Sequence, residues 1–304
     1  MNCPVPRRAR LLVAAFAFAL LIVPFSSARA QQQTEKSEGL SIGSTLSTIV
    51  DLGSDALSSA ARVVGDDPYS EFRETRYSND GLLSERDEIK LGQKIHVEAA
   101  KKYELTNEGQ ERANRIGQRV ARVSLRPNLT YRFYIIRSKE INAFSGPGGY
   151  IYVTTALMDL ANDEELASVL AHEVGHVVAR HSLKTLEQSQ SLGGIAELFG
   201  SLTGIAGEDA QQLGTAAASI VAGGLLAVHN REEEREADYL GVHTMAKAGY
   251  NPEGMISMFQ KLQRISHSSE SSLLGSLFSD HPDVQERIDN TRYEISRIRG
   301  ARRR

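Results

Sequence analysis

Apolar residues recur every three or four positions in five segments of the chain, which is the spacing of amphipathic helices. Ser84 can cap the first of these helices with its hydroxyl, and Asn162 can cap the third, where Glu165 completes a reciprocal capping box. Pro282 is typical of a first helical position and predicts the start of the last helix. These five predicted helices cover residues 84–100, 108–123, 162–181 with an extension toward 190, 230–249 and 282–299, and Asn251-Pro252 is expected to open a further helix after residue 249.

The pattern changes to alternation between the second and third predicted helices. Residues 130–136 carry an apolar or aromatic side chain at every second position, which indicates a half-buried strand. Short apolar runs follow at residues 141–144 and 150–155, and the Gly- and Pro-rich turn 146–149 separates them. We therefore expect a small antiparallel sheet beside the helices, in a mainly helical α+β fold.

The first thirty residues have the pattern of a secretory signal peptide. Three arginines precede an uncharged apolar run at residues 11–23, and Ala28-Arg29-Ala30 supplies the small residues of a cleavage site. The apolar run is too short to span a bilayer stably. We expect ordinary secretion with cleavage after Ala30, and the paired arginines leave the twin-arginine route as an alternative.

Composition and charge narrow the function classes. Removal of the predicted signal takes away four arginines and no acidic residue, which leaves 31 basic and 38 acidic residues and a charge of −7 with histidine neutral. This balance argues against nucleic acid as a partner. The sole cysteine, Cys3, lies in the predicted signal, so we expect no disulfide in the mature chain, which suits a bacterial periplasm. Residues 31–67, rich in Ser, Gly, Gln and Ala, predict a flexible arm before one folded domain over residues 68–304.

An apolar segment at residues 210–228 contains no Asp, Glu, Lys or Arg. Its glutamines, hydroxyl residues and several glycines favour a buried helix or loop over a bilayer span. A membrane-touching element is the alternative for this segment. The arginines at residues 302–304 are expected to be solvated, with contact to anionic lipid as their alternative.

One motif carries metal chemistry. His172-Glu173-Val174-Gly175-His176 places two imidazoles one helical turn apart, about 40° around the axis, so that both can reach one metal ion. A catalytic zinc ion needs a third protein ligand and an open position for water. His181 is nine residues beyond His172, about 180° around a continuous helix, and is expected to face away from the metal.

Two downstream carboxylates are candidates for the rest of the site. Glu234 and Asp238 lie four residues apart on one face of a predicted helix. Glu234 would bind the metal, and Asp238 would accept the ring proton of a metal-binding histidine. The alternative is an acidic solvated face, to which we assign the neighbours Glu232, Glu233 and Glu236.

Between residues 84 and 298 the chain resembles the M48 peptidases, a family of zinc metallopeptidases, and in organisation most closely its periplasmic BepA-like and LoiP-like members. Several ordered motifs together are far more specific than one. The motifs that carry the resemblance are His172-Glu173-Val174-Gly175-His176, Glu234-Arg235-Glu236-Ala237-Asp238, Asn142-Ala143-Phe144 followed by Pro147-Gly148-Gly149-Tyr150-Ile151, and His281-Pro282 with Arg287.

The resemblance implies a mainly helical zincin fold of the gluzincin type that holds one Zn²⁺ per chain. It implies Glu234 as the third ligand beside His172 and His176, with Asp238 supporting the ligands. Zinc held in this way would lower the pKa of a bound water and polarise the scissile carbonyl. Glu173 would take the proton as general base and return it to the leaving amine.

The resemblance also suggests how a substrate binds. The strand at 150–155 is expected to be the sheet edge to which an extended peptide adds by main-chain pairing, through Tyr150 and Ile151. Asn142 and Ala143 are expected to position that peptide. Such pairing would select unfolded or looped polypeptides over folded ones.

Two C-terminal residues are candidate catalytic groups. His281 is expected to approach the zinc as a gate or to stabilise the oxyanion, and Arg287 lies nearly two turns further along. The alternatives are a capping residue near the surface for His281 and an ion pair on a solvated face for Arg287. Four other histidines have no partner at ligand spacing and are assigned structural roles: His96, His229, His243 and His267.

These observations predict a periplasmic zinc endopeptidase that acts on unfolded or misassembled envelope proteins, with envelope assembly machinery as a candidate partner. One alternative is a periplasmic chaperone or assembly factor whose protease site is gated by His281 and residues 193–228. A second alternative is a membrane-attached protease anchored by residues 210–228.

Overall fold

The computed structural model describes residues 67–73, 75, 83–188, 217–224, 226, 229–268, 271–274 and 284–302, all within the unit formed by residues 65–304. The predicted signal peptide, almost all of the predicted arm and His281 lie outside the described residues, so those expectations stay predictions. Of residues 210–228 the structure describes 217–224 and 226, and Ala217, Ile220, Val221 and Leu226 are buried in a hydrophobic cluster, which agrees with the expected buried helix or loop. Among the helices that the structure describes, none has the length and apolar character needed to cross a membrane.

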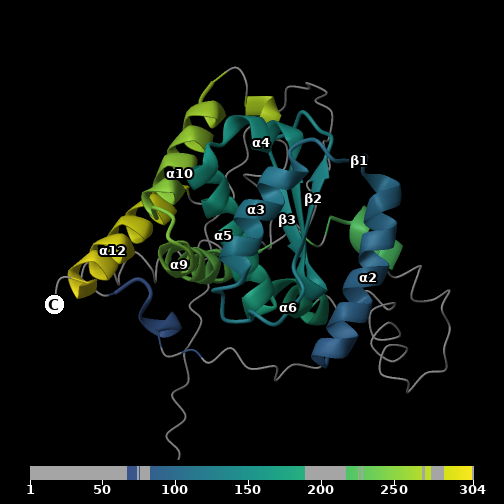
Figure 1. Cartoon of the computed structure of the whole chain (residues 1–304), viewed down its shortest axis with the longest axis horizontal. Helices are drawn as coiled ribbons and strands as arrows, with labels where there is room; N and C mark the ends of the chain where they lie inside the picture. Colours follow the sequence, from purple (N-terminus) through teal and green to yellow (C-terminus); the bar gives the residue numbers. More distant parts are fainter. Residues whose placement is uncertain are drawn as a thin grey trace, which may run out of the picture. The chain divides into compact units, whose positions relative to one another are not determined.

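The described elements are mainly helical (Figure 1). The α-helices are α2 (Glu85–Lys102), α3 (Gln110–Ala121), α4 (Thr155–Leu160), α5 (Asp163–Ala179), α6 (His181–Gln188), α9 (Arg231–Ala248), α10 (Glu253–Ser266) and α12 (Val284–Arg302). The 3₁₀ segments are η1 (Ser70–Phe72), η2 (Pro147–Gly149) and η3 (Ser271–Leu274). The strands are β1 (Leu105–Thr106), β2 (Arg132–Ile136), β3 (Ala143–Gly146) and β4 (Tyr150–Thr154).

Helix starts follow the capping residues of the sequence. The Ser84 hydroxyl accepts a backbone hydrogen bond in the first turn of α2. Asn162 and Glu165 form both bonds of a capping box at α5, and Asn230 and Glu233 form the same box at α9. A capping side chain typically stabilises a helix by about 1 kcal/mol. The predicted starts of these three helices are confirmed.

The strands form one mixed sheet in the order β1-β2-β4-β3. β2 and β4 run parallel, with Phe133 opposite Ile151, whereas β3 and β4 form an antiparallel hairpin with Phe144 opposite Tyr152. The prediction of a wholly antiparallel sheet is therefore wrong. Alternation identifies strands but says nothing about their order. β4, the second strand of the hairpin, therefore lies between β3 and β2 and is parallel to β2.

The turn between β3 and β4 holds α2 against the sheet. Gly148 and Gly149 have φ values of 73° and 86°, which glycine adopts without steric cost. A Cβ at Gly148 would lie 2.9 Å from the Cα of Ile89. The Gly148 N–H donates to buried Glu88 at 3.1 Å, and Glu88 also accepts hydrogen bonds from Arg126. One carboxylate thus joins the turn, α2 and the segment before β2.

Helix α5 is the centre of the domain, and Figure 1 shows α3, α9 and α10 around it. It contacts these three helices and strands β3 and β4. Its residues Leu166, Leu170, Val174 and Val177 are buried in the main hydrophobic core. Polar groups on so enclosed a helix must find hydrogen-bond partners or a ligand, because burial without one is costly.

Two glycines let α5 and α9 approach closely. A Cβ at Gly175 would lie 2.9 Å from the carbonyl oxygen of Ala237, a backbone atom that cannot move independently. A Cβ at Gly241 would lie 2.9 Å from the Cε of Met255 and 3.3 Å from the backbone nitrogen of His172. The missing side chains therefore set the separation at which residues on the two helices meet.

The predicted continuous helix through His181 is interrupted. α5 ends at Ala179, Arg180 adopts a left-handed conformation with φ of 58°, and α6 begins at His181. Arg180 is held by its side chain, which donates to the carbonyl of Leu83 at 2.5 Å and lies 3.1 Å from Glu88. This anchoring offsets the cost of a positive φ at a residue with a Cβ.

Residues 67–73 form a short strap that packs on α9 and α12. Tyr69 is fully buried, and its ring centroid lies 5.4 Å from that of Tyr239 on α9. Arg73 forms an ion pair of 2.6 Å with buried Glu294 of α12. Arg235 on α9 pairs with Glu71 at 2.6 Å. The strap is therefore part of the folded core.

Candidate metal centre

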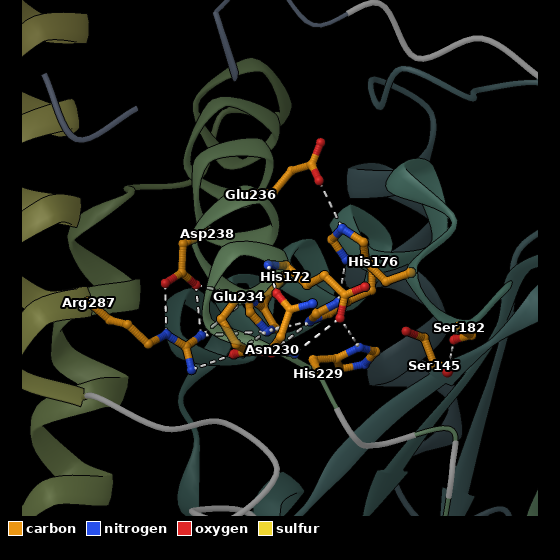
Figure 2. Close-up of polar contacts among 12 residues, drawn as sticks. Ser145, His172, His176, Ser182, His229, Asn230, Glu234, Glu236, Asp238 and Arg287 are labelled. Atoms are coloured by element: carbon orange, nitrogen blue, oxygen red, sulfur yellow. Dashed lines mark hydrogen bonds and ion pairs between the residues drawn. The ribbon is translucent and has the colours of Figure 1, made fainter. Parts of the chain in front are cut away.

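Two histidines of α5 and one glutamate of α9 meet at a buried point. His172 and His176 are one helical turn apart, and their Nε2 atoms are separated by 2.9 Å. Glu234 lies in the first turn of α9, with one oxygen 3.5 Å from Nε2 of His172 and the other 3.2 Å from Nε2 of His176. All three side chains are buried, and Figure 2 shows them gathered between the two helices.

This donor set fits a zinc ion. Ligand atoms about 2.0–2.1 Å from a tetrahedral zinc lie about 3.3 Å from one another. The separations of 2.9, 3.2 and 3.5 Å among the three donor groups bracket that value. Two imidazole nitrogens at 2.9 Å repel each other through their lone pairs unless a proton or a cation lies between them. The residues present are therefore suited to the metal that the sequence predicts.

Asp238 and Arg287 support the His172 side of the site. Nδ1 of His172 lies 2.9 Å from Asp238, so the carboxylate can accept the ring N–H and leave the Nε2 lone pair for a metal. Arg287, on α12, forms two hydrogen bonds of 2.7 and 2.8 Å with Asp238 and an ion pair of 2.8 Å with Glu234. Arg287 is only 5% exposed, so the alternative of an ion pair on a solvated face is wrong.

Buried charges set the pKa values at this point. Burial raises the pKa of Asp238, but the Arg287 guanidinium outweighs burial and holds that pKa below its ordinary value. Burial lowers the pKa of His172, yet Glu234 and Asp238 outweigh burial and raise it to about 9. Burial and the neighbouring histidines lower the pKa of His176 well below its ordinary value. The paired imidazoles of His172 and His176 thus accept one positive charge and resist a second.

His181 and Glu236 lie on the His176 side, where the sequence predicted neither. Nδ1 of His181 lies 2.8 Å from Nδ1 of His176, and Nε2 of His181 lies 2.9 Å from Glu236. The expectation that His181 faces away from the metal is wrong because the break at Arg180 redirects the chain. Glu236 is 8% exposed, so its assignment to a solvated face is wrong as well.

His229 and Glu233 also belong to this buried group. The ring of His229 stacks on that of His176, with centroids 3.8 Å apart. The structural role assigned to His229 agrees with this stacking, but its place in a close cluster with His176 and His181 was not expected from the sequence. Glu233 is 7% exposed and completes the α9 capping box, so it is not on a solvated face. The sequence signal that could have placed His229 near the site is its position one residue before the predicted helix that carries Glu234.

Glu173 is the buried acid beside the donor set. It follows His172 on α5 and is 2% exposed. Within the described part of the chain its Oε2 atom has no hydrogen-bond partner. A buried carboxylate oxygen without a partner is costly, and such an oxygen is suited to accept a proton from a bound molecule.

The sequence pattern of Peptidase family M48 matches residues 107–295, a range that contains every residue of this site. The chain belongs to peptidase family M48. Membership makes it a metalloendopeptidase, a hydrolase whose activity depends on a metal ion. The predicted family, enzyme class and α+β zincin-like fold are thereby confirmed.

Several M48 relatives are identical to this chain at about a third or less of the aligned positions. The metalloprotease YcaL of Escherichia coli is 28% identical over 198 residues, which cover 62% of this chain and 74% of YcaL. The metalloprotease LoiP of E. coli is 30% identical over 55% of this chain and 63% of LoiP. A putative beta-barrel assembly-enhancing protease of Vibrio cholerae is 33% identical over 60% of this chain and 38% of that protein. The matched part thus spans less than two thirds of two of these three relatives.

An apolar pocket opens beside Glu173 in this M48 domain. It has a volume of about 60 Å³ and lies between α5, α10 and α12. His172, Glu173 and Arg287 form its polar side. The other lining residues are Ala143, Leu157, Ser168, Val169, Met255, Met258, Phe259, Leu262 and Val284.

The strand expected to receive the substrate of this M48 peptidase is not an edge. β4 is paired with β2 on one side and β3 on the other, so the expectation that Tyr150 and Ile151 pair with a peptide is wrong. β3 is the outer strand of the sheet that the described residues form, and Ala143 on it, which is itself only 2% exposed, lines the pocket together with Glu173. Asn142 precedes β3 and pairs with Thr154.

The remaining predicted site residues lie elsewhere or outside the described residues. His281 belongs to the latter, so its role as a gate stays a prediction. His96 contacts the hydroxyl of Tyr152 at 2.9 Å, and His243 contacts Glu294 at 2.8 Å. Local partners of this kind agree with the structural roles predicted for these two histidines.

Proposed function

We propose that this chain is a zinc endopeptidase that cleaves extended or unfolded polypeptides. The convergence of His172, His176 and Glu234 next to buried Glu173 is the observation that carries the proposal. Zinc held by these three side chains would supply a water of lowered pKa and polarise the scissile carbonyl.

Glu173 is the proton carrier in this proposal. It takes a proton from the attacking water and returns it to the leaving amine, which a buried carboxylate with an unpartnered oxygen is suited to do. Arg287 contacts Glu234 and Asp238, so we assign it a positioning role in place of the catalytic role expected from sequence. His281 remains a candidate gate or oxyanion-stabilising group.

Strand β3 is the proposed docking edge for the substrate. The carbonyl of Asn142 accepts the N–H of Thr154, so the antiparallel alternation directs the N–H and C=O of Ala143 away from β4. A peptide paired with that edge would pass the pocket that Ala143 shares with Glu173. Only a chain segment free of its own secondary structure offers such pairing, which supports unfolded or looped substrates.

The apolar pocket supports a preference at the scissile bond. Its lining from α10 and α12 is methionine, phenylalanine, leucine and valine beside the polar edge. Burial of apolar surface contributes about 25 cal/mol per Å². We therefore propose that substrates place a large apolar side chain next to the bond that is cut.

The cell envelope is the proposed place of action. The signal-like first thirty residues support export to the periplasm, and one group of relatives is named for enhancing beta-barrel assembly. Misassembled envelope proteins are therefore the proposed natural substrates, and assembly machinery is a proposed partner. Cell fractionation tests the location, and carbonate extraction releases a peripheral protein but retains a chain anchored by residues 210–228.

The decisive experiment uses the purified chain, unfolded casein and two controls. We expect about one zinc ion per chain by elemental analysis, and casein cleavage that is lost in Glu173→Gln and after chelation, then restored by added zinc. Cleavage that survives both controls would contradict the proposal. Bound zinc without cleavage would favour the chaperone alternative, which predicts that Glu173→Gln keeps the function of the chain in cells.

A further inference from the structure

The two proposed metal histidines differ in what contacts the ring nitrogen that faces away from the metal. Nδ1 of His172 meets a carboxylate directly, at 2.9 Å from Asp238. Nδ1 of His176 instead meets another imidazole, at 2.8 Å from Nδ1 of His181. The carboxylate on this side, Glu236, lies one residue further out, at 2.9 Å from Nε2 of His181.

The chemistry of these groups fixes where the protons lie. A carboxylate accepts hydrogen bonds and donates none, so Nε2 of His181 carries its proton toward Glu236. A neutral imidazole has one N–H, which makes Nδ1 of His181 an acceptor. Nδ1 of His176 is then the donor in the 2.8 Å contact, and Nε2 of His176 keeps its lone pair toward Glu234.

We propose that His181 and Glu236 form a relay that fixes the tautomer and ring orientation of His176 for metal binding. This inference rests on the proposed metal centre. Asp238 acts on His172 directly, whereas Glu236 acts on His176 through His181. Each of these two carboxylates of α9 therefore supports one metal-binding histidine of α5. Partners of this kind orient a metal ligand and increase its basicity.

The fold brings His181 to this place by interrupting the helix. Five residues on a continuous helix correspond to about 140° around the axis, which would keep His181 away from His176. The left-handed conformation of Arg180, anchored by Glu88 and Leu83, turns the first residue of α6 back toward the site. His181 is fully buried there.

Stacking by His229 completes the support of His176. Its ring lies 3.8 Å from the ring of His176 with an interplanar angle of 19°. His229 therefore packs against the face of a ligand that the relay orients.

Zinc affinity tests the relay without use of catalytic activity. Competition with a chromophoric chelator is measured for the unmodified chain, His181→Phe and Glu236→Ala. We expect both variants to bind zinc about 10- to 100-fold more weakly. The matched control is His243→Phe, which breaks another imidazole–carboxylate contact, with Glu294, and should leave the affinity unchanged. Equal affinity of His181→Phe and the unmodified chain would overturn the relay.

Two further measurements separate a relay from a merely structural contact. Two groups in series should not add, so the double variant His181→Phe/Glu236→Ala should lose no more affinity than His181→Phe alone. Nitrogen-15 spectra of the unmodified chain should show His176 protonated at Nδ1 and His181 at Nε2. The opposite tautomers would overturn the proposal even if every variant failed to fold. No zinc binding by the unmodified chain would overturn the metal centre itself, and the relay with it.

Discussion

Helix α5 meets α9 on one side and α10 with α12 on another, and the two contacts have different compositions. The α9 side is a close approach at Gly175, filled with paired histidines and carboxylates. The α10 and α12 side is a small pocket lined mostly by flexible apolar residues. Metal coordination tolerates little displacement, whereas apolar recognition tolerates variation in size. The comparison teaches that one helix can carry a rigid site and an adaptable one on different faces.

Glu173 belongs to both sides, so its substitution gives the largest expected effect. Glu173→Gln removes the proton carrier while it keeps the size of the side chain. We expect casein hydrolysis to fall by about 10²- to 10⁴-fold with zinc affinity retained. Initial cleavage rates and zinc content measured on the same preparation provide the check. A variant that loses zinc together with activity would mean that Glu173 supports the metal instead.

The next largest effect is expected from substitution of Arg287, which pairs with the carboxylates on the α9 side. Arg287→Met leaves the carboxylates of Glu234 and Asp238 buried without their cation. Loss of one partner of a buried pair typically costs about 3–5 kcal/mol, and we expect that loss in the free energy of unfolding of the metal-free chain. Denaturant titration measures it. Arg292→Met is the matched control on the same helix, because its pair with Asp289 is solvent-exposed and should contribute little.

Gly175 tests whether the separation of α5 and α9 matters. Gly175→Ala would place a methyl group 2.9 Å from the carbonyl oxygen of Ala237. We expect a loss of about 1–3 kcal/mol of stability from overpacking, together with weaker zinc binding because Glu234 moves away from the histidines. Gly300→Ala, in a helix with no atom near the added carbon, should be neutral or stabilising. Unchanged zinc affinity in Gly175→Ala would show that the separation is adjustable.

Leu262 tests the adaptable side. Leu262→Ala enlarges the pocket beside Glu173 without contact to the donor set. We expect the ratio of kcat/KM between peptides with larger and smaller apolar side chains to change by about tenfold, with zinc affinity unchanged. A peptide series that differs at one position provides the measurement. An unchanged ratio would place the specificity elsewhere.

The smallest expected effect is a pH dependence of the stability that Glu294 contributes. Glu294 lies on α12, the helix that contributes to both sides. Burial raises the pKa of Glu294, but Arg73 and His243 outweigh burial and lower it to about 2. Because the folded pKa lies below the ordinary value of 4.5, this contribution is complete above about pH 4.5 and is lost as the pH falls toward 2. The stability difference between the unmodified chain and Glu294→Gln should therefore shrink between pH 5 and about pH 3. A constant difference would contradict this assignment.

The sequence predicted the features that depend on neighbouring residues. Caps at Ser84 and Asn162 placed two helix starts because a cap acts within one turn. The HExxH spacing placed His172 and His176 together for the same reason, since four residues make one turn. Features that depend on contacts between distant segments were not accessible in this way.

Strand order and the relay are the clearest cases of such contacts. The partners of β4 are chosen by packing, so alternation could not show that β4 runs parallel to β2 and lies inside the sheet. The position of His181 depends on the left-handed Arg180, which the distant residues Glu88 and Leu83 stabilise. Glu236 looked like part of an acidic surface because no local pattern shows that the N-terminal half of α9 is buried.

The strap at residues 67–73 bears on where the smallest independently folding unit begins. The family pattern starts at residue 107, yet Tyr69 is fully buried against Tyr239, and Arg73 pairs with Glu294. A shortened chain that began at residue 107 would expose this aromatic surface and leave a buried carboxylate without its arginine. Boundaries drawn from sequence similarity alone would therefore divide a cooperative unit, and expression of the domain should begin before residue 67.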